Sequence, residues 1–306
     1  MIVDAAACTA LPVAPSLLGE SPFWHPDEAA LYWCDIPGRT LNRYVPADPA
    51  SHRVWALDTE PGCCAPLQGG GLLMAMRDGL FRVDLGEGSA VRRTPVAPPP
   101  YDTAQLRFND GKADPLGRLW VGTVYEPRSE PLAALYRCTG ERVDRMAGEA
   151  TVANGLAFSP DARTLYWSDT TSHRIDAFDF DLGAGAISRR RVFAQFAKKP
   201  ADGDLGRYGG RPDGAAVDVE GALWVAMFEG QRLVRLDTQG RELQSVPLPV
   251  RCPTMPCFGG PDLKTLYVTT SREKRPAAEL AEQPLAGAVL VLRVGVPGLP
   301  VNFARL

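Results

Sequence analysis

One eleven-residue phrase occurs twice in this chain, and its recurrence limits the possible folds more than any other feature. The phrase reads HPDEAALYWCD at residues 25–35 and SPDARTLYWSD at residues 159–169, in the same register. A third copy, GPDLKTLYVTT, covers residues 260–270. In each copy a turn containing Pro and Asp leads into a short run of alternating apolar residues, which is typical of a β-hairpin and strand. The chain therefore repeats a β unit.

Three weaker copies extend the series. They are DPLGRLWVGT at residues 114–123, DVEGALWVAM at residues 218–227 and QGGGLLMAM from Gln68. A second short strand follows each of the six copies. The first leucine of each strand marks the period, with spacings of 42, 46, 46, 58 and 43 residues between Leu31, Leu73, Leu119, Leu165, Leu223 and Leu266.

Six β units of roughly 45 residues predict an all-β fold, a six-bladed β-propeller with four-stranded antiparallel blades around a central channel. We interpret residues 1–306 as a single propeller domain. Two β-sandwich domains are the alternative, but they do not predict an equal period throughout. The longest interval contains an insertion rich in Gly and charge, FAKKPADGDLGRYGGRPDG at residues 196–214, which we expect to be a surface loop or a lid.

Composition excludes several classes of partner. The net charge is −3 and the only block of basic residues is RRR at 189–191, so we expect no nucleic acid or membrane partner. The first residues, MIVDAAACTA, lack the basic start of a secretory signal, and no apolar run is long enough to span a bilayer. Seven cysteines, an odd number, favour reduced thiols and a cytoplasmic location. We expect a monomer or a weak homo-oligomer.

Polar residues occupy one equivalent position in four of the six units, five residues before the repeated turn. These are Glu20, Asn109, Asn154 and Asp213, and the same step reaches Cys63 and Met255 in the other two units. Pseudo-symmetry would bring such positions to one axis. Singly, Asn or Asp beside Gly is an ordinary turn residue. If these carboxylates and amides gather in one place without a lysine, burying their negative charge is costly unless a cation binds there. Oxygen ligands of this kind suit a hard divalent ion.

Arg107 lies two residues before Asn109 on the same expected strand, so alternation places both side chains on one side. Arg107 would donate to substrate oxygens there, and a structural salt bridge is the alternative. The chain contains no G-x-S-x-G, H-E-x-x-H or G-x-x-x-x-G-K motif. With these motifs absent, the simplest remaining mechanism is activation of a water molecule by a metal ion.

Five motifs in order along nearly the whole chain resemble the SMP-30/gluconolactonase family, which includes regucalcin. They are GESPFWHPDEAALYWCDI, RFNDGKADPLGRLWVGT, NGLAFSPDARTLYWSDT, RPDGAAVDVEGALWVA and FGGPDLKTLYVTT. The resemblance implies a six-bladed propeller with one divalent metal ion at the channel mouth. It also implies hydrolysis of sugar lactones such as gluconolactone, xylonolactone or arabinonolactone. It leaves open whether the ion is Ca, Zn, Mg, Mn or Fe(II).

By motif, the resemblance assigns metal binding to Glu20, Asn154 and Asp213, and substrate contact to Arg107 and Asn109. Family members also use a glutamate about twenty residues after that arginine. Here Glu126 stands one position early and Pro127 occupies the aligned place, which indicates a different substrate preference.

The hypothesis is that the ion polarises the lactone carbonyl while Asp213 acts as general base for the attacking water. One alternative is a metal-dependent phosphotriesterase or arylesterase using the same site. Another is a non-catalytic calcium-binding propeller, since fold does not fix function.

Overall fold

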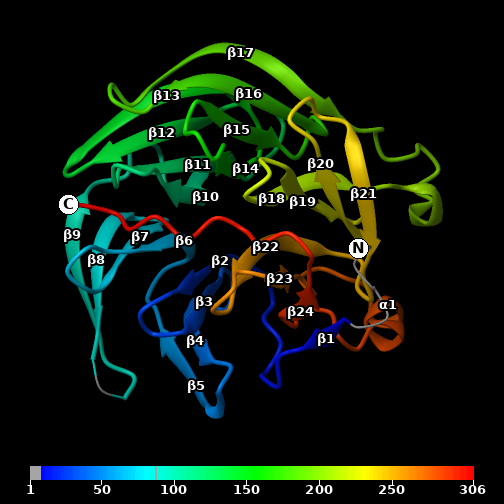
Figure 1. The fold of residues 1–306 in the computed structure, drawn as a ribbon, viewed down its shortest axis with the longest axis horizontal. Helices are drawn as coiled ribbons and strands as arrows, with labels where there is room; N and C mark the ends of the chain where they lie inside the picture. The colour runs from blue at the N-terminus through cyan, green and yellow to red at the C-terminus, as the bar shows by residue number, and fades with distance from the viewer. Residues whose placement is uncertain (1–7, 87) are drawn as a thin grey trace.

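Six four-stranded antiparallel sheets confirm the predicted six-bladed β-propeller. The structure is a computed structural model and describes residues 8–86 and 88–306. Figure 1 shows the sheets arranged as blades around a common centre. The first strand of each blade lies innermost, because the inter-blade contacts run between these strands.

The first three blades follow one another along the chain, each running from the centre outwards. Blade I consists of β2 (Gly19–His25), β3 (Ala30–Asp35), β4 (Thr40–Val45) and β5 (Asp48–Ala56). Blade II consists of β6 (Pro61–Pro66), β7 (Leu72–Met76), β8 (Gly79–Leu85) and β9 (Val91–Ala97). Blade III consists of β10 (Leu106–Ala113), β11 (Leu119–Tyr125), β12 (Ala133–Thr139) and β13 (Arg142–Ala150).

The next two blades have the same plan. Blade IV consists of β14 (Ala153–Phe158), β15 (Thr164–Asp169), β16 (Arg174–Asp181) and β17 (Ala186–Gln195). Blade V consists of β18 (Arg211–Val217), β19 (Leu223–Phe228), β20 (Arg232–Leu236) and β21 (Glu242–Pro247). The insertion between blades IV and V carries one short 3-10 helix, η2 (Leu205–Arg207).

Blade VI is assembled from both ends of the described chain. It consists of β22 (Pro253–Gly259), β23 (Thr265–Thr270), β24 (Leu290–Arg293) and, at its rim, β1 (Thr9–Ala10). Residue Thr9 pairs with Val291 and Ala10 with Leu290. This pairing ties the start of the chain to its last blade and so closes the ring. The α1 helix (Ala277–Glu282) lies between β23 and β24.

The repeated phrase supplies the packing between blades. All six anchor leucines are buried, and Trp33, Trp120, Trp167 and Trp224 are among the largest fully buried side chains. Burial of each such side chain stabilises the fold by about 1.5–3 kcal/mol. In two copies of the phrase an aspartate also fixes the buried tryptophan. Trp120 donates its indole N–H to Asp114 and Trp224 donates to Asp218, both at 2.9 Å.

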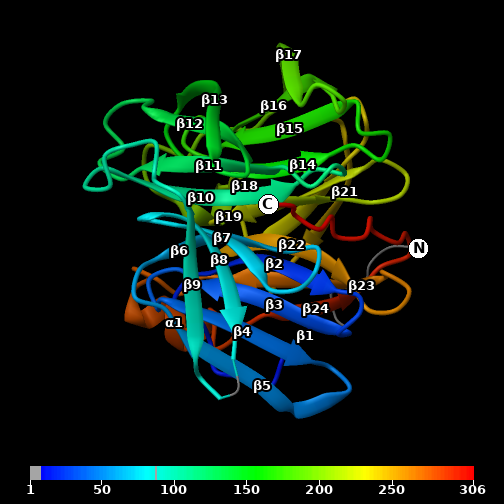
Figure 2. The same ribbon diagram turned by 90° about the vertical axis from the view of Figure 1, so that its left-hand side faces the viewer.

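The inner strands all run from one mouth of the channel to the other. The C-terminal segment crosses the second mouth, where Leu299 and Asn302 line a cavity and Ala304 pairs with Leu67 of blade II. Figure 2 shows this segment, in red, leaving blade VI and ending near β10. It leaves the first mouth open for a ligand.

All seven cysteines are free thiols, and all but Cys8 are buried. Within the described residues, no helix combines the length and apolarity that crossing a membrane would require.

Candidate active site

A cavity of about 520 Å³ occupies the first mouth of the channel, at the starts of the inner strands. Its lining includes four buried polar residues, each from a different blade and each between 4% and 8% exposed. They are the four polar residues that the sequence places at equivalent positions around one axis, here called the ring residues. These are Glu20 on β2, Asn109 on β10, Asn154 on β14 and Asp213 on β18. The structure therefore brings these four residues together at one place.

Irregular strand pairing turns these side chains toward the cavity. The register of the first hairpin shifts at or directly beside the ring residue in each of the four blades. A β-bulge bends its strand and redirects a side chain. Residue Gly155, directly after Asn154, adopts a left-handed φ of 60°, and Ser21 after Glu20 adopts φ 50°. Only glycine takes this conformation without strain, so the buried Ser21 holds stored strain beside the site.

A chain of hydrogen bonds crosses three blades at the cavity wall. Arg107 donates from Nη1 to Asn109 Oδ1 at 2.7 Å, and Asn109 Nδ2 donates to Asn154 Oδ1 at 2.7 Å. Asn154 Nδ2 then donates to Thr170 Oγ1 at 2.9 Å. The Thr170 hydroxyl in turn donates to the backbone carbonyl of Pro212, the residue before Asp213, at 2.7 Å. The chain fixes which way both amides face.

The last residue of the repeated phrase holds the start of the inner strand. In blade I the Asp35 carboxylate accepts from the backbone N–H groups of Leu17 and Leu18, at 2.8 and 3.1 Å. In blade IV Asp169 accepts from the N–H groups of residues 151 and 152, at 3.2 and 3.1 Å. These contacts lie two residues before Glu20 and Asn154, so the phrase positions the ring residues as well as the core.

Two carboxylates of the cavity are electrostatically unfavourable in the unliganded chain. Burial raises the pKa of Glu20 well above its usual value, and Asp213 and Asp110 raise it further. Burial likewise raises the pKa of Asp213, with Asp110 adding to the effect. The nearby arginines pair elsewhere, Arg107 with Glu126 at 3.6 Å and Arg211 with Glu229 at 3.3 Å. Two buried, repelling carboxylates of this kind favour binding of a cation.

The donor set fits a hard divalent ion. Glu20 and Asp213 supply carboxylate oxygens and Asn154 an amide oxygen, which are the ligand types that Ca²⁺ and Mg²⁺ prefer. Among the described residues, the buried Oδ1 of Asp110 has no hydrogen-bond partner, and this carboxylate is close enough to raise the pKa of both Glu20 and Asp213. Among residues 8–86 and 88–306, no group of three or more His, Cys, Asp or Glu side chains could hold a metal ion. The candidate set is instead two carboxylates completed by an amide.

Glu126 lines the cavity despite its shift of one position from the family pattern. Its carboxylate receives two hydrogen bonds from Arg77, at 2.8 and 3.0 Å. Arg77 also pairs with Glu60 at 3.0 Å, and both residues flank strands of blade II. Blade II thus contributes to the site through residues outside the ring position. Sequence periodicity did not reveal them because they stand in turns.

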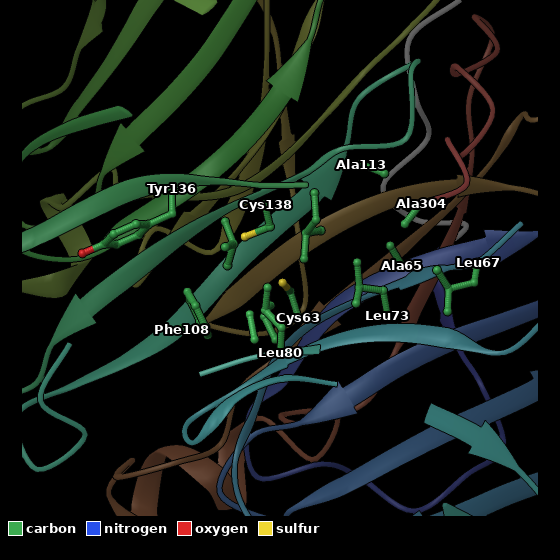
Figure 3. Close-up of a cluster of buried hydrophobic side chains, with 14 of the residues drawn as sticks. Cys63, Ala65, Leu67, Leu73, Leu80, Phe108, Ala113, Tyr136, Cys138 and Ala304 are labelled. Atoms are coloured by element: carbon green, nitrogen blue, oxygen red, sulfur yellow. The ribbon is translucent and has the colours of Figure 1, made fainter. Parts of the chain in front are cut away.

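The two remaining ring positions do not contribute polar groups, and one does not face the channel. Cys63 lies in the core between blades II and III, where it packs with Leu80 and Phe108 (Figure 3). The expectation that equivalent positions all face the channel is therefore wrong for Cys63, whose side chain packs in this apolar core. Met255 lines the cavity at the second mouth.

Residues 18–272 match the family described as the SMP-30/gluconolactonase/LRE-like region. The chain belongs to this family. The match spans most of the propeller and includes all four ring residues, which confirms the resemblance carried by the repeated motifs.

Members of the SMP-30/gluconolactonase family that resemble this chain include catalytic and calcium-binding proteins. A 6-deoxy-6-sulfogluconolactonase of Pseudomonas putida is 43% identical over 93% of this chain and 94% of its own length. Regucalcin of Danio rerio is 36% identical over 92% and 93% of the two chains. The crystal structure of a calcium-binding regucalcin from Agrobacterium tumefaciens superposes with a TM-score of 0.88 at 29% identity, covering 97% of each chain.

Proposed function

We propose that the protein hydrolyses a sugar lactone to its aldonic acid with the help of one divalent metal ion. The observation that carries the proposal is the convergence of Glu20, Asn154 and Asp213, from three blades, on one buried cavity beside Arg107. Relatives named for lactone hydrolysis support the reaction class, and one regucalcin described as calcium-binding supports the ion.

The ion would be held by Glu20, Asn154 and Asp213. When bound, a divalent cation supplies a Lewis acid that polarises the lactone carbonyl. Arg107 and Asn109, already joined by a hydrogen bond, would orient the hydroxyl groups of the sugar. The remaining chemistry belongs to the chain's own groups.

Asp213 is the proposed general base. Its second carboxylate oxygen would accept a proton from the water that attacks the carbonyl carbon. The bond between that carbon and the ring oxygen then breaks, and the ring oxygen takes the proton back to become a hydroxyl group. Water and lactone are thereby converted to one aldonic acid, with no other reactant.

The substitution Asp213→Asn tests this proposal. Acid release from D-glucono-1,5-lactone and 6-deoxy-6-sulfogluconolactone would be followed at constant pH, and divalent ion binding would be measured separately. We expect kcat to fall about 100-fold or more, because an amide cannot accept the proton, while ion binding weakens less. Asp262→Asn is a matched control, since Asp262 is exposed and forms an ion pair with Arg293 at the surface. Equal loss of turnover and ion binding would contradict the base role.

The polar lining favours a lactone over the phosphotriester or aryl ester of the alternative hydrolases. Arg107 and Asn109 offer hydrogen bonds to a polyol, which an apolar ester would leave unused. A panel of aryl esters and phosphotriesters run with the lactones distinguishes these classes.

A further inference from the structure

The residues that line the candidate site would carry an excess of positive charge once the proposed ion is bound. Six acidic residues line the cavity together with six basic residues, which are Arg77, Arg107, Arg128, Arg211, Lys274 and Arg275. Two of the acidic residues, Glu20 and Asp213, are the proposed ligands, so a divalent ion would neutralise both. Four carboxylates would then face six cationic side chains. An anion from solution or substrate would complete this balance.

Most of these cationic groups are committed to partners. Arg77 pairs with Glu60 and Glu126, at 3.0 and 2.8 Å. Arg275 and Arg211 share Glu229, at 3.0 and 3.3 Å.

Lys274 and Arg107 are also paired. Lys274 pairs with Glu273 at 3.1 Å, and Arg107 contacts Glu126 at 3.6 Å. Arg128 differs from all of these, because no carboxylate oxygen of residues 8–86 or 88–306 lies within 4.0 Å of its guanidinium group.

Arg128 is held at the rim by a turn that directly follows β11. Its backbone N–H donates to the carbonyl of Tyr125 at 3.1 Å, and its φ is 56°, a left-handed conformation that is costly for any residue with a Cβ. The side chain is exposed and lines the cavity together with Arg211 and Phe228 of blade V. The turn therefore presents an unpaired cation over the cavity.

The depth of the two sets of residues determines which end of a substrate meets Arg128. The proposed reaction takes place at the buried carboxylates, so the lactone carbonyl enters first. In a hexono-1,5-lactone C6 is the one carbon outside the ring, so a group on C6 projects away from the ring and can reach the rim. A guanidinium group there is suited to a sulfonate, phosphate or carboxylate, to which it can donate two hydrogen bonds.

We propose that Arg128 binds an anionic group on C6 of the substrate, outside the lactone ring, and that the preferred substrates are aldonolactones with a negative charge at C6. This inference rests on the proposed lactone hydrolysis and narrows its substrate class. It assigns to Arg128 the role of a specificity-determining residue.

The test compares four lactones with one substituted arginine and one control. Glucono-1,5-lactone would be assayed beside 6-deoxy-6-sulfogluconolactone, 6-phosphogluconolactone and glucarolactone, with wild-type protein, Arg128→Gln, Arg128→Lys and Arg189→Gln. Arg189 is a matched control because it is exposed, has a φ of 50° and lies on the outer strand β17, far from the cavity. The three anionic lactones show which of the three groups the site prefers.

We expect the wild-type protein to have a higher kcat/KM for at least one anionic lactone than for gluconolactone. The substitution Arg128→Gln should lower the ratio of these two kcat/KM values about tenfold, chiefly through KM, and Arg128→Lys should restore part of the ratio. Arg189→Gln should leave the ratio unchanged. A wild-type preference for the neutral lactone, or an equal effect of Arg128→Gln on both classes, would overturn the proposal.

Failure of the proposed lactone hydrolysis would give a different result from failure of the Arg128 proposal. The wild-type protein would then hydrolyse none of the four lactones with any ion. In that case the corresponding aldonate anions would be titrated calorimetrically into wild-type and Arg128→Gln protein. Weaker binding to Arg128→Gln would still support the anion site, and equal binding to the two proteins would overturn it.

Discussion

The side-chain amide of Asn109 donates a hydrogen bond of 2.7 Å to the amide oxygen of Asn154, and so joins the inner strands of blades III and IV. The oxygen of Asn154 is thereby turned toward Asn109, because its nitrogen is already bound to Thr170. A residue proposed for substrate contact and one proposed for ion binding thus share one network, which couples lactone binding to the geometry of the ion site.

Thr170 is expected to act on ion binding without touching the ion. The substitution Thr170→Val removes the acceptor for the Asn154 nitrogen and the donor to the Pro212 carbonyl, so both neighbouring ligands lose support. We expect the affinity for a divalent ion to fall about tenfold, measured by calorimetric titration. Thr164→Val, at the other end of β15, is the control. Unchanged affinity in Thr170→Val would show that the network does not orient Asn154.

The pairing of Arg77 with Glu126 is expected to support substrate binding. In Arg77→Gln the Glu126 carboxylate loses two hydrogen bonds, so we expect KM to rise about tenfold with a smaller change in kcat. Glu126→Gln should act in the same direction. Because the two side chains act as a pair, the double variant should lose little more than either single variant, a coupling of about 1 kcal/mol.

Arg82→Gln serves as control for this cycle, since Arg82 on β8 pairs with Asp84 and does not line the cavity. Strictly additive effects of Arg77→Gln and Glu126→Gln would contradict a functional pair.

The ion-free protein is expected to become less stable as the pH rises. The pKa values of Glu20 and Asp213 are raised in the folded chain by burial and by repulsion from Asp110, and Asp213 raises the pKa of Glu20 further. A raised pKa favours folding while the group is protonated, and this contribution is lost as the pH rises through the folded-state pKa. The melting temperature of the ion-free protein should therefore fall between acidic and mildly alkaline pH, and a divalent ion should reverse that fall.

Calorimetry in two buffers of different ionisation enthalpy provides a second measurement. Ion binding should release protons, because the carboxylates must be deprotonated to act as ligands. A melting temperature that does not depend on pH, with no proton release, would contradict the assignment of these two carboxylates.

Asp218 is expected to contribute to stability alone. It is fully buried and accepts from Trp224 Nε1 at 2.9 Å and from Arg235 Nε at 2.8 Å, so Asp218→Ala removes the partner of both N–H groups, and only Arg235 keeps a second carboxylate, that of Glu220. We expect a loss of about 3 kcal/mol in the free energy of unfolding, measured by denaturant titration. Asp262→Ala, at the surface, should change it by less than about 0.5 kcal/mol. A loss of the same size in both variants would contradict this role.

The regular spacing of the six leucines was sufficient to predict the blades, because each copy of the repeated phrase encodes the same turn and strand. The ring residues followed from the same period, and the structure places Glu20, Asn109, Asn154 and Asp213 at one cavity. Cys63 departs from the pattern because it packs in the apolar core between blades II and III, and the period alone does not indicate which equivalent position turns inward.

The sequence did not reveal the strand that closes the ring. β1 is only two residues long, too short for any periodicity, and it pairs with a strand from the far end of the chain. Arg77 and Arg128 were missed for another reason. They stand in turns between strands, where no alternation indicates which way a side chain points. The resemblance of Arg211-x-Asp213 to Arg107-x-Asn109 was a visible signal for Arg211.

Restoration of lactone hydrolysis by a single ion tests the central claim most directly. The protein would be stripped of metal, assayed by acid release on the lactone panel, and assayed again after addition of Ca, Zn, Mg, Mn or Fe(II) one at a time, with bound ion counted per chain. We predict that turnover disappears on stripping and returns with one equivalent of at least one ion. Full turnover by the metal-stripped protein, or none above the spontaneous rate with any ion, would contradict the account.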